Sequence, residues 1–511
     1  MTPKPTQPKL STPASKPQVW GSRMSEPPDP RNVLYCAGRD VAPRPMADSA
    51  LVPFDLWQNR AHVLMLAKQG IVSRKIASRI LAALDDLESL WERREFVLDP
   101  AREDVHINIE HFVATVIGPE ASGSMHTARS RNDQTTTVVR LYVRDRLLTF
   151  AESLVRLIDV LLDASRKYAH LPIAGLTHYQ PASVTTFGHW LASYAQALLR
   201  DLERAEQTLH RLNVSPLGAA ASFGTTWKID RVYTAQLLGF DSVQGNSLDC
   251  ISTRWEFEAE AAVLVAFVLT HLSTIAQDLI VLSLPQVGIV RVADRFTTGS
   301  SIMPQKRNPD FAEVTRAKAA LVQQLVPTLL GIARGLPSGY NRDTQWTKYA
   351  IMDVFDEATA APEIFADVIA TLQVNEARAR ESAETNFINA VDVADTLARE
   401  SGAPFRVCYQ IISQAVRECE SRGRLLPDVV VQLAREAGVQ VQSVNFLSAE
   451  QILNEKNHIG GPAPSALARE IRNVREQLQQ RKKQLAAFRK RLTRAKMKIE
   501  QERKKLRQSP K

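Results

Sequence analysis

The chain of 511 residues is too long for one compact core, and at roughly 150 residues per domain it predicts two to four domains. Its longest apolar run, Ala261 to Leu269, is shorter than the roughly 20 residues of a membrane span, and no secretory signal opens the sequence. These features argue against a membrane protein or a secreted protein, so we expect a cytoplasmic location. Four widely spaced cysteines favour free thiols over a disulfide scaffold.

The formal net charge of +9 is concentrated at one end of the chain. Residues 481–511 contain 14 basic residues and two glutamates, a local net charge of +12, so the residues before them sum to about −3. The basic isoelectric point therefore describes a C-terminal tail. It does not indicate that the body of the protein binds nucleic acid.

The N-terminal part of the chain divides into two regions. Residues 1–32 are rich in proline, and such a segment is expected to be disordered. A helical N-terminal domain is predicted over residues 33–130. Within it, residues 58–91 carry apolar side chains at helical spacing, and Gly70 predicts a break in that pattern.

Four long helical patterns follow and predict a central domain over residues 131–370. They cover residues 136–168, 185–212, 253–284 and 309–334. Each is longer than the usual helix of about 11–12 residues, and alternating strand patterns are nearly absent. The predicted fold class is therefore all-α, an elongated bundle of long helices. Because the run from Ala261 to Leu269 is apolar all round, we expect subunits to share the core of this bundle.

Two smaller regions complete the chain. Residues 371–465 predict a small helical C-terminal domain, and residues 466–511 predict a basic helical tail. The apolar positions of the tail are spaced seven, three and four residues apart: Leu478, Leu485, Phe488 and Leu492. A short coiled coil is one interpretation, but a solvated basic helix is favoured over it. No known module accompanies the tail, so nucleic-acid binding is not expected.

The first of three polar segments, HTARSRNDQ at residues 126–134, precedes a long helix. A helix N-terminus favours an anion. Arg131 can hold a carboxylate through two hydrogen bonds, and Ser130 and Asn132 can donate further ones. A charged loop that only caps the helix is the alternative, and spacing alone favours binding only slightly.

The second segment, LTHYQP at residues 176–181, places Thr177 and His178 before a proline turn. A lone histidine is more often structural than catalytic, so this segment alone is weak evidence for a site.

The third segment, TTGSSIMPQKRNPD at residues 297–310, combines a glycine with polar and charged side chains. Gly299 permits motion, and Ser300, Lys306 and Asn308 could close over an anion. A flexible linker is the alternative. Neither a nucleotide-binding glycine loop nor a metal-ligand spacing accompanies the three segments, so we predict a reaction without cofactor or metal on an anionic substrate.

These residues resemble a known family. GSSIMPQKRNPD resembles the loop shared by the fumarase/aspartase superfamily, and HTARSRNDQ, LTHYQP and NSLDCISTR are similar to its argininosuccinate lyase branch. The resemblance covers about residues 33–464. It implies a homotetramer built on a bundle of long helices, three domains in each subunit, and active sites formed where three subunits meet.

The resemblance implies reversible elimination of an amine from an N-substituted aspartate, which releases fumarate. Removal of a proton next to a carboxylate creates a doubly charged aci-carboxylate, which cations and hydrogen-bond donors must stabilise. By the same resemblance Ser300 is the general base, acting as an oxyanion, and Lys306 and Asn308 stabilise the charge. His178, paired with Glu313, is implied to be catalytic, either as a proton donor or as a positioning group.

The resemblance also implies which side chains hold the dicarboxylate substrate. The implied substrate-binding residues are Ser130, Arg131, Asn132, Thr177, Ser301, Met303, Tyr340, Gln345 and Lys348. It implies no metal and no cofactor.

The sequence departs from the family where the amine would bind. A serine and an aspartate near the N-terminus usually help to hold the arginine portion; here Asp40 and Asp48 are both candidates, and Arg39 has the wrong charge for a guanidinium partner. The acidic residues that usually follow the glutamine are replaced in Gln-Trp-Thr-Lys at residues 345–348. We therefore predict a substrate whose amine part carries carboxylates, as in ethylenediamine-N,N′-disuccinate. As a candidate substrate it ranks level with or slightly ahead of argininosuccinate. A catalytically silent structural protein, or one that binds nucleic acid through its tail, is the alternative of another class.

Overall fold

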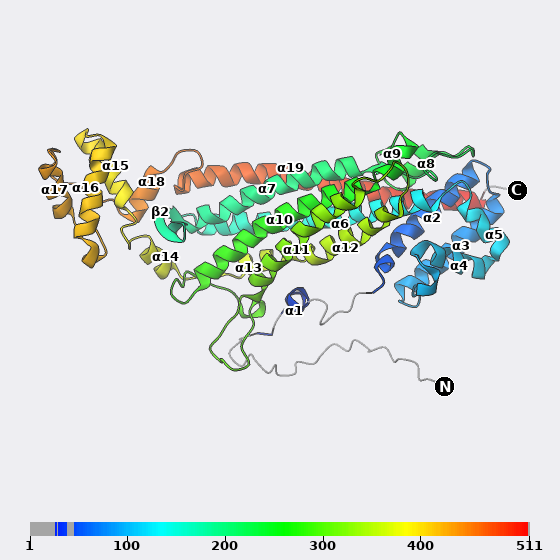
Figure 1. Cartoon of the computed structure of the whole chain (residues 1–511), viewed down its shortest axis with the longest axis horizontal. Coiled ribbons are helices and arrows are strands. Elements are labelled where there is room, and N and C mark those ends of the chain that lie inside the picture. The colour runs from blue at the N-terminus through cyan, green and yellow to red at the C-terminus, as the bar shows by residue number, and fades with distance from the viewer. Residues whose placement is uncertain (1–25, 28, 38–44, 509–511) are drawn as a thin grey trace.

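The computed structural model describes residues 26–27, 29–37 and 45–508. Asp40 and Arg39, two residues considered for the amine end, lie outside the described residues. The molecule is elongated, with long helices side by side along its axis and smaller groups of helices at its two ends (Figure 1).

Helices make up most of the described chain. The helices up to residue 123 are α1 (Pro30–Ala37), α2 (Val52–Lys68), α3 (Arg74–Glu92), α4 (Val105–Ile117) and α5 (Pro119–Gly123). The helices of the central region are α6 (Arg131–Lys167), α7 (Phe187–Leu212), α8 (Arg231–Leu237), α9 (Ser247–Ser252), α10 (Arg254–Ser283), α11 (Asp310–Ala333), α12 (Thr347–Ala358) and α13 (Ala361–Ala370). The remaining helices are α14 (Glu376–Ser382), α15 (Ala390–Ser401), α16 (Phe405–Glu418), α17 (Pro427–Glu436), α18 (Ala449–Glu455) and α19 (Pro464–Gln508).

Short elements join these helices. The 3-10 helices are η2 (Ala47–Leu51), η3 (Pro100–Arg102), η4 (Ser124–His126), η5 (Asp294–Phe296), η6 (Arg342–Trp346) and η7 (Glu420–Arg422). The strands are β1 (Pro172–Thr177), β2 (Gln180–Thr186), β3 (Val214–Ser215), β4 (Ser242–Val243), β5 (Val290–Arg291) and β6 (Gln373–Val374). They form three two-stranded sheets, of which β1–β2 and β5–β6 are antiparallel and β3–β4 is parallel.

The predicted all-α fold with a bundle of long helices is confirmed. The four long patterns correspond to α6, α7, α10 and α11, and the apolar side chains between these helices form the main core. Gly70 has a φ of +69° and separates α2 from α3, as the sequence predicted. The four cysteines are free, which agrees with the expected thiols.

One chain does not cover all the apolar surface of the bundle. Val263 and Phe267 on α10 are 37% and 45% exposed, and Leu321 and Leu330 on α11 are nearly half exposed. Among the described residues, α10 alone is long and apolar enough to cross a membrane by length and composition. More than half of its most apolar stretch is buried inside the chain, as in the core helix of a globular protein. The predicted cover by other subunits stays a prediction.

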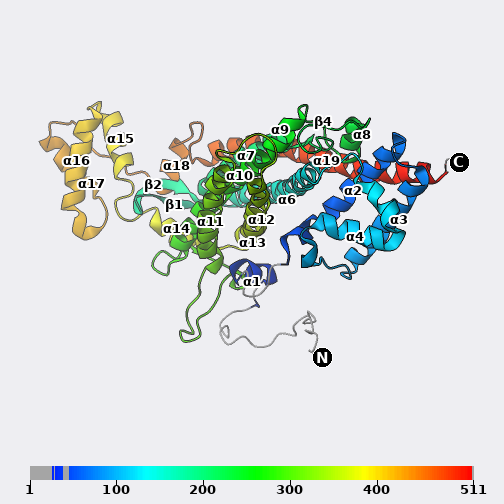
Figure 2. The ribbon, with the colours of Figure 1, turned by 45° about the vertical axis from the view of Figure 1, so that its right-hand side comes forward.

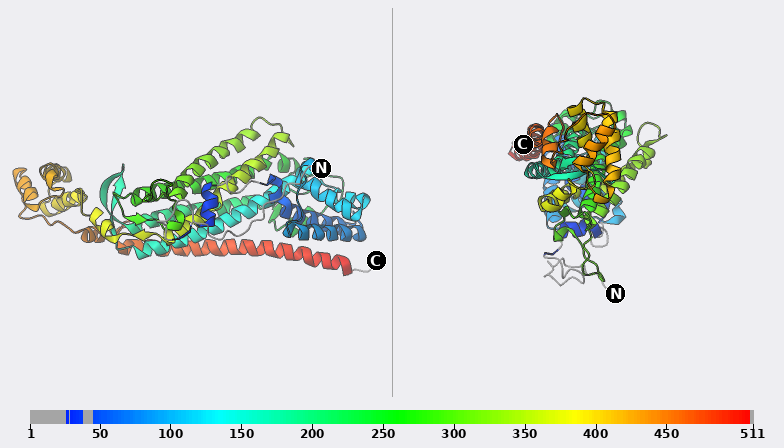
Figure 3. Two further views of the ribbon diagram at one scale, coloured as in Figure 1. Left: turned by 90° about the horizontal axis from the view of Figure 1, so that it is seen from below. Right: turned by 90° about the vertical axis from the view of Figure 1, so that its left-hand side faces the viewer.

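The helices α15, α16 and α17 project from one end of the bundle (Figure 3). They pack around an apolar cluster of their own, which includes Leu397, Ile411 and Leu433. The predicted domain boundaries stay predictions, but this region does have a core that is separate from the main one.

Ordered structure begins earlier than expected. Helix α1 starts at Pro30, inside the segment predicted to be disordered. The side chain of Asp29 accepts a hydrogen bond from the backbone N–H of Arg31 at 2.8 Å, and proline is well suited to the first position of a helix. On the opposite side, Tyr35 packs into the core and its hydroxyl lies 2.9 Å from Thr315 Oγ1.

The interpretation of the tail as a solvated helix is wrong. The tail belongs to α19, a straight helix of 45 residues that runs along the whole bundle to the N-terminal helices (Figure 3). Its buried apolar side chains recur at spacings of three, four or seven residues: Ile471, Val474, Leu478, Leu485, Leu492, Ala495 and Ile499. This is the heptad seam of a coiled coil, and it is packed against α6, α7, α2 and α3 of the same chain.

Basic side chains of α19 also pair with acids of the body. The pairs are Arg475 with Asp163, Arg481 with Glu206, Arg489 with Glu152, Arg491 with Asp241, and Arg503 with Asp85. Most of these side chains are partly exposed, and such pairs contribute little each. The apolar seam is therefore the main attachment of α19.

Leu478→Ala is expected to lower the stability by about 2–5 kcal/mol, because it removes a fully buried side chain from the seam. Urea unfolding followed by circular dichroism would measure this as a lower midpoint. Met497→Ala is the matched control on the same helix, since Met497 is 57% exposed. Equal midpoints for the two variants would contradict the packed seam.

Candidate active site

The polar segment before α6 is a preorganised helix entrance. Ser130 caps α6: its Oγ accepts from the backbone N–H of Asn132 at 3.2 Å, and Asp133 Oδ1 accepts from the N–H of Ser130 at 2.9 Å. The second oxygen of Asp133 accepts from the N–H groups of Gly218 and Ala220 at 2.8 and 3.0 Å. The entrance is thus fixed to the loop after β3.

Arg131 is held at this entrance by neighbouring polar groups. It donates to Gln134 Oε1 at 2.9 Å and to Glu110 Oε2 at 3.2 Å. His126 Nδ1 lies 3.0 Å from the other oxygen of Glu110. Burial alone would raise the pKa of Glu110, but the hydrogen bond with His126 and the charge of Arg131 lower it below its ordinary value. Glu110 therefore stays ionised and orients Arg131.

A buried polar network supports the entrance from behind. Asp55 Oδ1 lies 2.8 Å from His106 Nδ1 and accepts from Gln134 Nε2 at 3.1 Å. Arg129 donates to Asn59 Oδ1 at 2.7 Å. Burial opposes ionisation of Asp55, yet the charges of His106 and Arg129 hold its pKa below the ordinary value.

Sequence reasoning missed this network. Neither His106 nor Glu110, in the segment EDVHINIE at residues 103–110, is among the site residues predicted from the sequence. The two lie four residues apart, and on a helix such residues share one face. That spacing was the available signal, but the partners on α2 are about 50 residues away in the chain.

Lys348 lies at the same end of the molecule, inside a buried ion pair. Its Nζ is 2.5 Å from Asp48 Oδ1, and both side chains are about 5% exposed. Asp48 Oδ2 accepts from the N–H of Val105 at 3.0 Å. The preceding residue, Asp104, lies 3.8 Å from Arg131. Asp48, one of the two acids considered for the amine end, thus belongs to the entrance region.

A cavity of about 480 Å³ adjoins Gln345. Its lining residues are Arg342, Gln345, Trp346 and Tyr349. The rings of Trp346 and Tyr349 meet edge to face with centroids 5.3 Å apart, and Arg342 pairs with Glu103 at 2.7 Å. The hydroxyl of Tyr340 lies 3.5 Å from Gln345 Oε1. The four lining residues offer one cation, one amide and two aromatic rings, and none of the four is acidic.

Thr177 and His178 lie on a hairpin and not on a simple turn between helices. Thr177 ends β1, and the two turn residues, His178 and Tyr179, have φ values of +54° and +60°. Two-residue hairpin turns of this hand usually contain glycine or asparagine, because other residues are strained there. All three side chains are exposed. Strain of this kind is concentrated at functional sites.

The loop of residues 298–308, here called the catalytic loop for the role predicted from its sequence, projects from the body between α10 and α11 (Figure 2). The backbones of Thr298 and Asn308 pair with each other at its base, through two hydrogen bonds of 3.0 and 2.8 Å. Beyond this base the loop is open to solvent, and Ile302 is 83% exposed.

Two side chains of the catalytic loop are engaged within it. The Oγ of Ser300 accepts from the backbone N–H groups of Ile302 and Met303 at 3.4 and 3.1 Å. Asn308 Nδ2 donates to the carbonyl oxygen of Gly299 at 3.3 Å. Donors on Ser300 Oγ stabilise negative charge at that atom.

The structure gathers some predicted site residues and separates others. Ser130, Arg131, Asn132, Tyr340, Gln345 and Lys348 lie at one end of the bundle, near the start of α6. Thr177 and His178 follow the far end of α6, whose 37 residues span about 55 Å. Figure 1 shows these two regions at opposite ends of the bundle.

The catalytic loop is a third location, which holds Ser300, Ser301, Met303, Lys306 and Asn308. Glu313 lies just beyond it, in the first turn of α11. Within the described part of one chain, His178 and Glu313 form no hydrogen bond or ion pair. One chain therefore does not assemble all three segments.

Comparisons with known proteins identify the family of the chain. The family described as "Lyase" matches residues 46–324, and the family described as "Argininosuccinate lyase C-terminal" matches residues 387–454. Argininosuccinate lyase of Hahella chejuensis is 37% identical over 463 residues, which cover 90% of this chain and 97% of that protein. Argininosuccinate lyase of Nitrosococcus oceani is 38% identical over 461 residues, with coverage of 90% and 97%.

Solved structures give the same result for the fold. EDDS lyase in complex with formate superposes with a TM-score of 0.83 and 26% identity, over 94% of this chain and 96% of that one. An EDDS lyase variant with bound fumarate gives a TM-score of 0.84 with the same identity and coverage. Together with the motif segments on their helix boundaries, these matches show that the chain belongs to the argininosuccinate lyase branch of the fumarase/aspartase superfamily and is a carbon–nitrogen lyase.

Proposed function

We propose that this lyase eliminates an amine from an N-substituted aspartate and releases fumarate, with Ser300 as the general base. The observation that carries this proposal is the pair of backbone N–H groups directed at Ser300 Oγ. A serine hydroxyl is a poor base, and donors aimed at its oxygen favour the deprotonated form. The fumarate bound to an EDDS lyase variant of the same fold supports the dicarboxylate product.

The other predicted residues divide between the two carboxylates and the developing charge. Ser130, Arg131 and Asn132 offer N–H and O–H donors at a helix N-terminus, where an anion is stabilised. Lys306 is exposed on the catalytic loop, and none of the described ion pairs joins it to an acidic residue of the body. Its ammonium group can therefore stabilise the aci-carboxylate.

Thr177 and His178 would meet these groups in a complete site. His178 would act on the leaving nitrogen or orient the substrate, with Glu313 of another subunit as its partner. The exposed and strained hairpin turn supports a role in which these side chains reach out of their own chain.

We propose that the complete site forms between subunits of a homotetramer, one supplying each segment. A separation of about 55 Å along α6 prevents one chain from joining the helix entrance to the hairpin. The exposed apolar side chains of α10 and α11, such as Phe267 and Leu321, support close packing with other copies. A cytoplasmic location remains part of the proposal.

The cavity at Gln345 supports an amine partner that carries carboxylates. Arg342 offers a cation, and Trp346 stands where the family usually has an acid. A guanidinium group in this cavity would meet a like charge and no carboxylate among the four lining residues. An aminopolycarboxylate such as ethylenediamine-N,N′-disuccinate would meet a cation and two aromatic rings.

Argininosuccinate is the second candidate substrate, and a specific observation favours it. The curated relatives that are 37–38% identical over 90% of this chain are argininosuccinate lyases. Asp48, an acid in the entrance region, could bind a guanidinium group, although its carboxylate already pairs with Lys348 at 2.5 Å. The lining of the cavity is our reason to propose the aminopolycarboxylate as the first candidate.

Ser300→Ala is expected to lower kcat by about 10²- to 10⁴-fold, the usual contribution of a general base. Fumarate absorbance in the ultraviolet measures the turnover, and calorimetric titration with fumarate tests whether the site remains intact. Ser193→Ala, an exposed serine on α7, is the control. Turnover near that of the wild type in Ser300→Ala would rule out this base.

Substrate preference is expected to depend on Trp346. The wild type should release fumarate faster from ethylenediamine-N,N′-disuccinate than from argininosuccinate. Trp346→Glu restores an acid beside Gln345 and should shift the ratio of kcat/KM values about tenfold or more toward argininosuccinate. Trp346→Phe keeps the aromatic ring and serves as the control. A wild type that prefers argininosuccinate, with no shift in the glutamate variant, would refute the substrate proposal.

Glu110→Gln should raise the KM about threefold to tenfold with a smaller change in kcat, because a partly exposed pair no longer orients Arg131. The folded-state pKa of Glu110 is depressed, so its contribution to stability is present above the unfolded pKa and is lost as the pH falls through the folded pKa. The difference in stability between the wild type and Glu110→Gln should therefore disappear as the pH falls, and acid unfolding would measure this. Glu95→Gln, in an exposed pair with Arg93, should leave the KM unchanged.

A further inference from the structure

A buried acid lies at the foot of the catalytic loop. Asp294 is the first residue of η5, and its side chain is only 2% exposed. Arg307 faces it: Nη1 lies 2.9 Å from Oδ1, and Nη2 donates to Oδ2 at 3.4 Å. Two nitrogens on two oxygens fix the plane of a guanidinium group, which a single contact would not do.

Asp294 is itself held by the body of the protein. The Nη2 of Arg291, on β5, lies 3.5 Å from its carboxylate. Its carbonyl oxygen accepts from the N–H and the Oγ1 of Thr297, each at 3.1 Å. The acid thus links β5, η5 and the returning arm of the catalytic loop.

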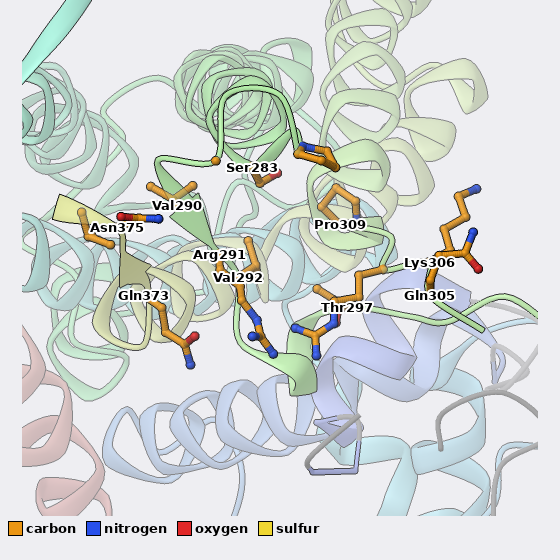
Figure 4. A pocket seen from close by; sticks show the side chains of 14 residues that line it. Ser283, Val290, Arg291, Val292, Thr297, Gln305, Lys306, Pro309, Gln373 and Asn375 are labelled. Carbon is orange, nitrogen blue, oxygen red and sulfur yellow. The ribbon is translucent and has the colours of Figure 1, made fainter. Parts of the chain in front are cut away.

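A cavity opens beside the catalytic loop on this side. Its volume is about 810 Å³, and it is lined by Arg291, Thr297, Lys306, Arg307 and Pro309 together with residues of β6. Figure 4 shows Arg291, Thr297 and Lys306 among the side chains that line it. Beside this open space, the polar contacts of Arg307 at the base of the loop contribute to the direction of its returning arm.

The contact between Asp294 and Arg307 matters because of the two residues that flank Arg307 in the chain. Arg307 lies between Lys306 and Asn308, the two residues proposed to stabilise the developing charge. Its side chain is 19% exposed, so it points into the protein while Lys306 is exposed to solvent. A rotation of the backbone at Arg307 would displace both flanking side chains, and a displacement of about 1 Å can cost about 10²-fold in rate.

We propose that Asp294 is a positioning residue for the elimination, which acts through Arg307 to set the direction of Lys306 and Asn308. This inference rests on the proposed catalytic role of the loop. Asp294 does not touch the substrate. Its effect should therefore be on the transition state, where negative charge develops at the carbon that loses the proton and on its carboxylate, and little on substrate binding.

A double-mutant cycle in the full-length protein tests this coupling. Asp294→Asn keeps the shape of the side chain and removes its charge, and Arg307→Gln removes the guanidinium group. Each should lower kcat about 10- to 100-fold with KM within about threefold of the wild type. The double variant should lose no more than the worse single variant, because both break the same link.

Asp201→Asn is the matched control. Asp201 is fully buried on α7 and pairs with Arg204 at 2.8 Å, far along the chain from the loop. Its loss should lower the melting temperature alone, so kcat should stay within about twofold of the wild type. If Asp294→Asn does not fold, Arg307→Gln decides the question, since its side chain lies nearer the surface.

The outcomes separate this inference from the function on which it rests. A kcat of Asp294→Asn within twofold of the wild type overturns the positioning role, as does a double variant whose loss is the product of the two single losses. An active Ser300→Ala variant would overturn the catalytic loop itself. An inactive Ser300→Ala beside a fully active Asp294→Asn overturns the positioning role alone.

Discussion

The rest of the structure depends on one constraint, which is the length of the straight helix α6. Its 37 residues are held in the main core by side chains along the whole helix, including Leu141, Leu148 and Leu161. A helix buried over such a length cannot bend to bring its ends together. The proposed anion-binding entrance at its start and the hairpin after its end are therefore about 55 Å apart in each chain. This geometry favours a site that is completed by assembly with other copies of the chain.

The two proposed parts of the site differ in how they are held. The entrance to α6 rests on the buried carboxylates of Asp55 and Asp133 and on the partly exposed Glu110, each of which is bonded to several donors. The buried part of this network is costly to disturb, because any group left unpaired would be buried without water. The catalytic loop is held at its base by the Thr298–Asn308 pairing and the Asp294–Arg307 contact. A rigid part for the proposed binding and a projecting loop for the proposed catalysis suit a reaction that must admit its substrate and then exclude water.

Helix α19 bears on the stability of the whole chain. Its heptad seam contacts α6 and α7 along the bundle and reaches α2 and α3, and α2 contributes Asp55 and Asn59 to the network behind the entrance. One helix therefore joins the central bundle to the N-terminal helices. Its basic residues face partly toward acids of the body, which explains how a segment with a net charge near +12 can lie on a chain whose remainder is slightly acidic.

The sequence by itself determined the elements that depend on local pattern. The four long helices, the break at Gly70 and the absence of a large sheet follow from the spacing of apolar residues, because a helix or strand buries one face at a fixed period. Ser300, Lys306 and Arg131 are predicted site residues on another ground, namely side-chain chemistry at helix boundaries and the family resemblance.

Only the tertiary structure decided which distant residues meet. The heptad of α19 was visible, but its partner could have been solvent, another chain or the body, and the sequence does not choose among them. The contacts of Asp48 with Lys348 and of Asp294 with Arg307, and the strained turn at His178, depend on how whole helices pack. Period and propensity are properties of neighbours in the chain, whereas a site is built from neighbours in space, and that arrangement is set by the shared core.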